Sequence, residues 1–293
     1  MSTVTKAVIP AAGRGTRFLP VTKSLPKEML PVVDTPSIQY VVEEAVAAGL
    51  TDILIITARG KHAIEDHFDQ NVDLELFLEQ RDKGAQLSEL QALDDLADIH
   101  YIRQTEQLGL GHAVGLARKH VGDEPFAVLL GDDIMVDDAA LLSSMLAVHE
   151  RERASVLALL EVTPAEIASL GCAAVDRIDD TLGRVRSIVE KPKPEEAPSN
   201  LAVIGRYVFT PEIFGALDRI TPGVGGELQL TDAIGLLLAD SAVFGRIFTH
   251  GRYDIGKKLG FLQANIELAL DRDDVGPELA DYLRELVRAR GLT

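Results

Sequence analysis

The stretch "VIPAAGRGTRFLPVTKSLPKEMLP", residues 8–31, starts as an apolar run and continues as a loop rich in glycine, proline, arginine and lysine. The apolar run is typical of a buried strand, and the prolines exclude a long helix directly after it. Gly13 and Gly15 allow the backbone to approach a ligand closely. Because open α/β sheets bind ligands where their strands end, this stretch predicts an α/β fold with a ligand site at the loop.

The glycine spacing matches neither of two common phosphate-binding motifs. The dinucleotide fingerprint has a third glycine where this chain has Phe18, which disfavours a Rossmann dehydrogenase. The loop also lacks the GxxxxGK[ST] pattern of the P-loop. Backbone N–H groups near Gly13 and Gly15 can still bind phosphate oxygens or a base edge. Arg17 and Lys27 can neutralise a polyphosphate, so we interpret the loop as nucleotide-binding.

The charge of the loop differs in sign from that of the whole chain. The formal net charge is −17, which argues against nucleic acid or an anionic membrane as a partner. Residues 1–30 nevertheless hold five basic residues against one acidic residue, a local charge of +4. Such a basic segment in an acidic protein predicts a small anionic ligand.

Length and composition indicate an ordinary globular protein. With 293 residues and 46% apolar content the chain can bury a large core without disulfides. The single cysteine, Cys172, fits a reducing compartment. The first residues do not resemble a signal peptide, and no apolar run approaches the ~20 residues of a membrane helix. We expect a cytoplasmic protein.

Short apolar runs alternate with helical patterns in the first half of the chain. Strands are predicted at residues 6–10, 52–57, 99–104 and 126–130. Helices are predicted at residues 36–48, 60–69, within 72–96, and at 111–121. This alternation predicts a Rossmann-like, mostly parallel central sheet flanked by helices.

The second half of the chain predicts a more mixed arrangement. Four strand-like runs lie close together between residues 155 and 209, and "KPKPEEAPSN" reads as a loop. Helices are predicted at residues 211–217, 231–239, 258–270 and 277–289. No flexible linker divides the chain. We therefore expect one domain, residues 1–293, with a nucleotide-binding lobe (about 1–150) and a sugar-phosphate lobe with C-terminal helices (about 151–293).

Six motifs in order carry a resemblance that runs along nearly the whole chain. The motifs are "AAGRGTRFLP" continuing into "TKSLPKEMLP", "QLGLGHAV" (107–114), "GDD" (131–133), "VEKPKPEEAPSNLAVIGRYVF" (189–209), "GGELQLTDAI" (225–234) and "DIGKKLGF" (254–261). The chain thereby resembles the sugar-nucleotidyltransferase superfamily, and within it the bacterial UTP–glucose-1-phosphate uridylyltransferases. The resemblance implies a nucleotide-diphospho-sugar transferase-like fold. It also implies a Mg²⁺-assisted reaction of UTP and glucose 1-phosphate to UDP-glucose and pyrophosphate.

The resemblance also assigns residues to roles. Catalytic roles fall to Arg17, Lys27 and Lys191. Nucleotide binding falls to Ala11, Ala12, Gly13, Gly15, Glu28, Gln104 and Gly109. Sugar binding falls to Gly171, Glu190 and Gly205. The metal ligands are Asp132 and Asp254, and each follows a strand-like run. Either Lys257 or Lys258 can reach phosphate, and the sequence does not choose between them.

Other readings of the chain stay open at this point. One is a glucose-1-phosphate thymidylyltransferase, and another is a non-catalytic regulatory module of the same fold. The seven histidines are scattered, and we interpret them as surface or cap residues. The last predicted helix has an apolar stripe that suits packing within the chain or against a second subunit. We expect a homodimer or homotetramer.

Overall fold

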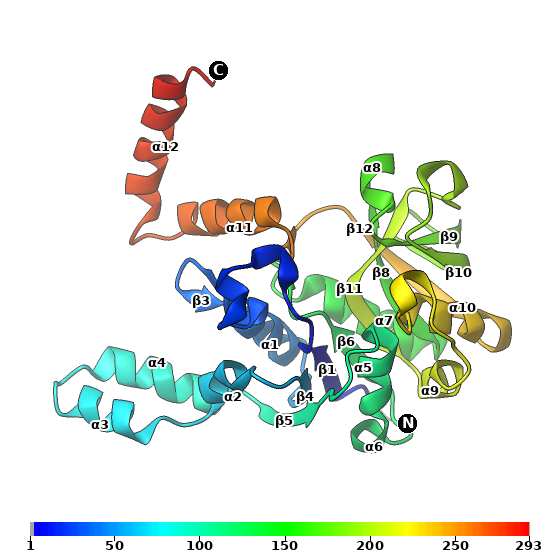
Figure 1. Cartoon of the computed structure of the whole chain (residues 1–293), viewed down its shortest axis with the longest axis horizontal. Helices are drawn as coiled ribbons and strands as arrows, with labels where there is room; N and C mark the ends of the chain where they lie inside the picture. The colour runs from blue at the N-terminus through cyan, green and yellow to red at the C-terminus, as the bar shows by residue number, and fades with distance from the viewer. Residues whose placement is uncertain (1–2, 293) are drawn as a thin grey trace.

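The computed structural model describes residues 3–292, and one large sheet forms its centre (Figure 1). Within these residues the sheet has nine strands. Their spatial order is β5 (Asp98–Arg103), β4 (Asp52–Thr57), β1 (Lys6–Pro10), β6 (Phe126–Leu129), β11 (Leu201–Phe209), β8 (Ser155–Glu161), β12 (Val243–Phe248), β10 (Leu182–Glu190) and β9 (Gly171–Arg177).

The sheet is parallel in its first part and mixed beyond it. The pairs β5–β4, β4–β1 and β1–β6 are parallel, as predicted for the first half of the chain. Strand β11 pairs antiparallel with both β6 and β8, and β9 and β10 form an antiparallel hairpin. The strands of the second half therefore continue the same sheet.

Two small sheets lie outside the large one. One joins β2 (Pro31–Val32) to β3 (Thr35–Pro36), and the other joins β7 (Asp133–Met135) to β13 (Arg252–Asp254). The β7–β13 pair links segments more than one hundred residues apart, and both of its strands adjoin the predicted metal ligands.

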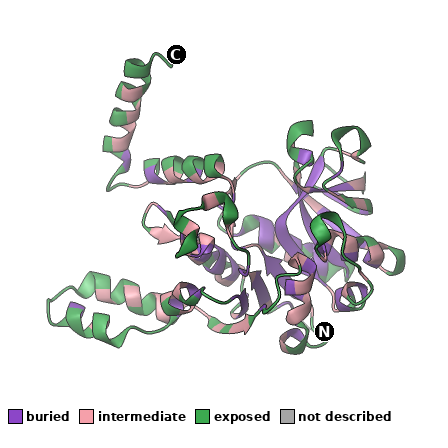
Figure 2. Ribbon diagram, viewed as in Figure 1, coloured by how far each residue is buried: buried purple, intermediate pink, exposed green. Residues whose placement is uncertain are grey.

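Helices cover both faces of the sheet. The helices are α1 (Ser37–Ala47), α2 (His62–Phe68), α3 (Val72–Glu79), α4 (Gly84–Asp94), α5 (Leu110–Leu116), α6 (Arg118–Val121), α7 (Ala140–Glu152), α8 (Pro164–Ile167), α9 (Glu212–Leu217), α10 (Leu230–Asp240), α11 (Lys258–Leu270) and α12 (Gly276–Arg290). Helices α1, α2 and α7 contribute to the core on one face, and α5, α6, α9 and α10 to the core on the other. Figure 2 shows the buried residues gathered in the sheet, whereas the α3–α4 pair and α12 are mostly exposed.

Most predicted elements are present with small shifts in their ends. The predicted helix within residues 72–96 is two helices, and Asp82 between them has φ 53°. The predicted helix at 111–121 divides near Ala117 into α5 and α6. Helix α7 lies where no element was predicted, although its buried residues Leu141, Met145 and Val148 recur at helical spacing.

Within residues 3–292, no helix is both long and apolar enough to span a membrane.

Candidate active site

The basic loop after β1 folds into three short 3₁₀ helices. They are η1 (Thr16–Phe18), η2 (Val21–Lys23) and η3 (Lys27–Met29). Pro20 and Pro26 precede η2 and η3, so each proline stands where a missing N–H group costs nothing. The loop is therefore compact, and it holds Arg17 and Lys27 near the carboxyl ends of the parallel strands.

A cavity of about 490 Å³ lies beside this loop. Its lining includes these predicted nucleotide-binding residues: Ala12, Gly13, Gly15, Glu28, Gln104 and Gly109. Lys27 and Asp132 line it as well. Ala11 lies behind the wall, where its N–H donates to Ile56 O and its carbonyl accepts from Lys61 Nζ. Segments far apart in sequence thus form one nucleotide-sized cavity.

Two of the quoted motifs meet at the wall of the cavity. Gly109 has φ 116°, and a Cβ atom there would lie 2.7 Å from the backbone oxygen of Leu228. The N–H of Leu228 donates to Leu108 O at 2.6 Å, and that of Gly111 donates to Leu228 O at 2.8 Å. Only glycine suits position 109, because both its backbone angle and the close packing exclude a side chain.

Gln104 is buried at the end of β5 and points into the same region. Its carboxamide nitrogen lies 3.1 Å from Gly109 O and 2.9 Å from His112 Nδ1. These contacts fix the plane of the carboxamide, so that its oxygen is presented in a defined direction. Gln107 donates to Ala12 O at 2.6 Å and accepts from Arg14 at 2.6 Å, which ties the loop to the segment after β5.

Glu28 and Lys61 form a buried ion pair under the cavity. The Lys61 ammonium lies 2.7 Å from Glu28 Oε2, and the two side chains are 9% and 1% exposed. Burial raises the pKa of Glu28 against the opposing charges of Lys61 and Lys27, and burial lowers the pKa of Lys61. Glu28 Oε1 is buried and has no hydrogen-bond partner within the described residues.

Asp132 and Asp254 converge at Gly256. A Cβ atom on Gly256 would lie 2.6 Å from Asp132 Oδ2 and 3.1 Å from Asp254 Oδ1, so the two oxygens are at most 5.7 Å apart. The pairing of Asp133 in β7 with Asp254 in β13 produces this convergence. Two carboxylates at this spacing suit one hard divalent cation.

Basic side chains surround the two carboxylates. Lys27 donates to Asp132 Oδ2. Burial acts to raise the pKa of Asp132, but Lys27, a backbone hydrogen bond and Arg17 together hold the pKa below its ordinary value. Burial likewise acts to lower the pKa of Lys27, but Asp132 and Glu28 together raise this pKa. Lys257 lies 3.1 Å from Asp254 Oδ2, so of the two candidate lysines Lys257 adjoins the carboxylates.

Arg17 lies at the edge of this group. Its guanidinium is 3.4 Å from the carbonyl of Gly256, and the residue is exposed and outside the cavity lining. The positive charge of Arg17 therefore lies beside the two carboxylates, where it could contact the charged oxygens of a bound polyphosphate.

Asp133 and Arg252 form an ion pair next to the carboxylates of Asp132 and Asp254. Asp133 Oδ1 lies 2.7 Å from Arg252 Nε, and Asp254 Oδ2 lies 3.8 Å from the same guanidinium. Burial raises the pKa of Asp133, against Arg252 and Arg206. Gly205 donates to Asp133 Oδ2 at 3.1 Å, and a Cβ atom there would lie 2.8 Å from that oxygen. Close packing against Asp133 therefore explains why position 205 is a glycine, and a role of Gly205 in sugar binding stays a prediction.

Two of the three predicted sugar-binding residues, Gly171 and Glu190, lie together at the end of the β9–β10 hairpin. Gly171 pairs with Glu190, and Glu190 Oε2 accepts from Thr231 at 2.7 Å. Lys191 follows with φ 45°, and its ammonium lies 3.1 Å from Glu190 Oε1. These residues form a second cluster, outside the lining of the 490 Å³ cavity.

Sequence reasoning missed several residues that build the site. Lys61, Gln107, Thr231 and Arg252 were not singled out, although each contacts a residue that was. Lys61 follows β4 by four residues, so the rule that ligands bind beyond strand ends could have found it. Arg252 carries no such signal, because its importance depends on the pairing of β13 with β7.

Comparisons with known proteins agree with this geometry. A family model described as nucleotidyl transferase matches residues 6–270. A UTP–glucose-1-phosphate uridylyltransferase of Bacillus subtilis is 49% identical over 97% of this chain and 96% of its own length. A UTP-bound UDP-glucose pyrophosphorylase of Acinetobacter baumannii superposes with a TM-score of 0.90 at 39% identity, covering 97% of this chain and 99% of that one. Another pyrophosphorylase, solved with UDP-glucose, has a TM-score of 0.85 at 38% identity, covering 92% and 100%.

Proposed function

This chain belongs to the nucleotidyl transferase family, and we propose that it joins UTP and α-D-glucose 1-phosphate into UDP-glucose and pyrophosphate. The observation that carries this function is the convergence of a basic glycine loop and Asp132 on one nucleotide-sized cavity, with Asp254 meeting Asp132 at Gly256. Identity near one half to uridylyltransferases over nearly the full chain disfavours a thymidylyltransferase and a non-catalytic module.

The reaction needs positioning and charge stabilisation more than proton transfer. A phosphate oxygen of glucose 1-phosphate forms a bond to the α-phosphorus of UTP. The bond from that phosphorus to the oxygen bridging the β-phosphate breaks, and pyrophosphate leaves. Because the attacking phosphate is already an anion near pH 7, no general base is required. Arg17 and Lys27 bind the triphosphate and offset the charge that grows on the leaving group.

Uridine binds in the cavity beside Gln104 and Gly109. The Gln104 nitrogen is occupied by Gly109 O and His112, so its carboxamide oxygen is the group that meets the uracil edge. Glu28, which lines the cavity, accepts a hydrogen bond from the nucleoside, while Gly13 and Gly15 bring backbone N–H groups to the phosphates.

The residues at Gly256 fit the Mg²⁺ ion that the reaction is expected to use. Asp132 and Asp254 would hold it, since two carboxylates plus substrate oxygens and water are an ordinary magnesium environment. When bound, the ion neutralises phosphate charge. Lys27 donates to Asp132 Oδ2, so the lysine and the ion would share this carboxylate.

Glucose 1-phosphate binds at the second cluster. Lys191 contacts its phosphate, and Glu190 accepts hydrogen bonds from the sugar hydroxyls. A Cβ atom on Gly171 would lie 3.1 Å from Thr231 Oγ1 and 3.5 Å from Glu190 Oε2, so the glycine lets both side chains lie against the backbone. This division assigns the nucleotide to residues of about 1–150 and the sugar phosphate to residues of about 151–293.

We expect a homodimer or homotetramer in the cytoplasm. Helix α12 packs on α11 and projects from the body of the molecule (Figure 1). Apolar residues on both helices are exposed, among them Leu259, Leu262 and Tyr282, and a second subunit would cover them. Cys172 is buried and free, which suits a reducing compartment.

An assay of pyrophosphate release tests the function. The protein is supplied with Mg²⁺, one of UTP, dTTP, ATP, CTP or GTP, and one of several sugar 1-phosphates. Release is expected with UTP and glucose 1-phosphate together, with neither alone, and it should stop when a chelator is added. Equal rates with UTP and dTTP, or no release with any pair, would contradict the proposal.

A further inference from the structure

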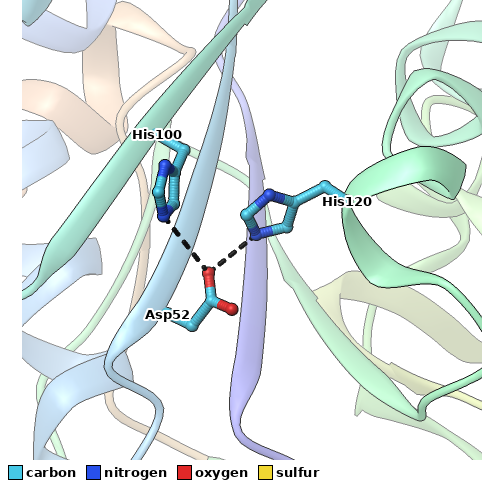
Figure 3. Close-up of side chains that lie close together, drawn as sticks. All are labelled: Asp52, His100 and His120. Atoms are coloured by element: carbon cyan, nitrogen blue, oxygen red, sulfur yellow. Dashed lines mark hydrogen bonds and ion pairs between the residues drawn. The ribbon is translucent and has the colours of Figure 1, made fainter.

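Two histidines and one aspartate meet at the edge of the sheet opposite the active site. Asp52 is the first residue of β4, His100 lies in β5, and His120 lies in α6 (Figure 3). The active-site cavity lies beyond the other end of β4. At a rise of about 3.3 Å per residue, the length of β4 separates the two places by about 16 Å.

The three side chains direct their ligand atoms to one point. Both imidazoles face the carboxylate from opposite sides in Figure 3, with His120 Nε2 2.7 Å and His100 Nε2 3.9 Å from Asp52 Oδ1. All three ligand atoms lie within 4.8 Å of one another. In a tetrahedral zinc site with bonds of about 2.05 Å, ligand atoms are ~3.3 Å apart, which lies within this range.

The positions of these side chains are determined by regular structure. In the β4–β5 ladder Leu54 pairs with His100, which places His100 two residues along from Asp52 on the same face of the sheet. The carbonyl of His120 accepts from Lys6 Nζ at 3.1 Å, which ties α6 to β1. Lys6 in turn lies 2.7 Å from Glu124, so its charge is paired beside the cluster. Ligands on such elements need little rearrangement to bind an ion.

We propose that Asp52, His100 and His120 bind a divalent cation that prefers imidazole ligands, with Zn²⁺ as the reference ion. Two nitrogen donors and one carboxylate favour Zn²⁺, Co²⁺ or Ni²⁺ over Mg²⁺, which prefers oxygen ligands. The His100 side chain is 55% exposed, so the ion can enter from solvent and keep a water as its fourth ligand. The bound ion would join β4, β5 and α6, and it would stabilise the folded protein.

A titration of the metal-stripped full chain tests this site. Zn²⁺ binding is followed by calorimetry, and Co²⁺ serves as a second probe through its visible absorption. The parent protein should bind one equivalent that His100→Ala lacks, or binds at least ~100-fold more weakly, since even outer-shell changes cost 10–100-fold in metal affinity. His120→Ala should lose the same equivalent.

A matched variant separates this site from adventitious binding. His62 is also exposed and lies 3.4 Å from Glu65, but it belongs to no three-ligand group among the described residues. His62→Ala should keep the full equivalent. Zn²⁺ should raise the melting temperature of the parent and of His62→Ala, but not that of His100→Ala. Equal zinc affinity and stoichiometry in all three proteins would show that the cluster is only a hydrogen-bonded group.

The test does not depend on the catalytic proposal. Zinc binding and melting are measured without substrate. The Mg²⁺-dependent release of pyrophosphate should be unchanged in His100→Ala, because the cluster is remote from the cavity. A loss of zinc binding with intact turnover therefore supports the metal site, whatever the nucleotide specificity is.

Discussion

At the residue scale, the Glu28–Lys61 pair shows how a buried charge is held at a ligand site. Both side chains are removed from water, and each depends on the other for compensation. Lys61 also binds the carbonyl of Ala11, so it connects the acidic side chain to the start of the glycine loop. The pair therefore fixes the orientation of the Glu28 carboxylate at the wall of the cavity.

Replacing Lys61 by methionine should destabilise the protein strongly. The change leaves Glu28 buried without its partner, and breaking a buried pair costs about 3 kcal/mol or more in the free energy of unfolding. Lys61→Met/Glu28→Gln should recover at least half of the loss, because no charge then remains unpaired. Urea denaturation of the parent, the single variant and the double variant measures this. A double variant no more stable than the single one would contradict the explanation.

The stability loss in Lys61→Met should also depend on pH. Burial already raises the pKa of Glu28 in the folded state, and removing the lysine raises it further. The folded variant then binds more protons than the unfolded chain, so its stability falls as pH rises. The loss relative to the parent should therefore shrink as pH is lowered from 8 toward about 5, just above the ordinary glutamate pKa of about 4.3. A pH-independent loss would exclude Glu28 as its cause.

Arg17 provides a test of the basic loop. Arg17→Ala should reduce kcat by ~10²-fold, because a cation that meets the leaving pyrophosphate acts mainly in the transition state. Lys23→Ala removes the same charge from the same loop. Arg17 contacts Gly256 beside the two carboxylates, and Lys23 has no such contact among the described residues, so the rate of Lys23→Ala should change little. Steady-state kinetics of both variants measure this difference in kcat. Similar rates for the two would show that only the overall charge of the loop counts.

At the element scale, the ends of the parallel strands determine where the candidate active-site residues lie. Strands β1, β4, β5 and β6 are parallel, so their carboxyl ends reach one edge, where the basic loop, Lys61, Gln104 and Asp132 follow. The β9–β10 hairpin belongs to the other half of the sheet and ends in a separate cluster. The left-handed backbone of Lys191, φ 45°, is a strained conformation for a residue with a side chain, and such strain often marks functional sites.

Lys191→Met should weaken the binding of glucose 1-phosphate and leave the binding of UTP unchanged. Methionine keeps most of the length of the lysine side chain and meets the same backbone strain, so the variant mainly tests the charged ammonium group. We expect KM for glucose 1-phosphate to rise by about 10–100-fold, the range for one lost hydrogen bond to a charged group. Lys193→Met, two residues along and exposed, should resemble the parent. Equal increases in KM for both substrates would contradict the division into two clusters.

At the scale of the whole molecule, the short β7–β13 pair joins the two halves of the active site. Asp132 adjoins β7, and Asp254 ends β13, so the two carboxylates meet only when these strands pair. Asp133 is buried and Arg252 is partly buried, and their ion pair supports the pairing of the two strands. The same short pair therefore links the proposed nucleotide-binding residues to the segment that leads into α11.

Changing either carboxylate to an amide should impair turnover without unfolding the protein. Asp132→Asn should lower kcat by at least ~10²-fold, and Asp254→Asn by less, because water can replace one of two protein ligands. Asp138→Asn is the control, since Asp138 is exposed and asparagine tolerates its φ of 52°. Kinetics over a range of Mg²⁺ concentrations should show a raised Mg²⁺ requirement in the first two variants alone. Unchanged Mg²⁺ dependence in Asp132→Asn would contradict the assignment of Asp132 as a metal ligand.

The sequence by itself determined the local features of this protein. The apolar run of β1 and the Gly/Pro loop could be read directly, since strand pattern and turn chemistry depend on neighbouring residues. Most helices and strands, the glycines proposed to bind nucleotide and the family resemblance were likewise available from short stretches. Helix α7 was overlooked, although its periodic apolar residues carry the same kind of signal.

Only the tertiary structure decided which distant residues share a site. The histidines were interpreted as surface or cap residues, yet His149 is buried, and His100 and His120 meet at Asp52. The Glu28–Lys61 pair, the contact of Lys257 with Asp254 and the support from Arg252 were also unforeseen. Each depends on the register of a strand pair or on where a helix packs. Those positions are determined by burial of the whole core, which no single stretch of sequence specifies.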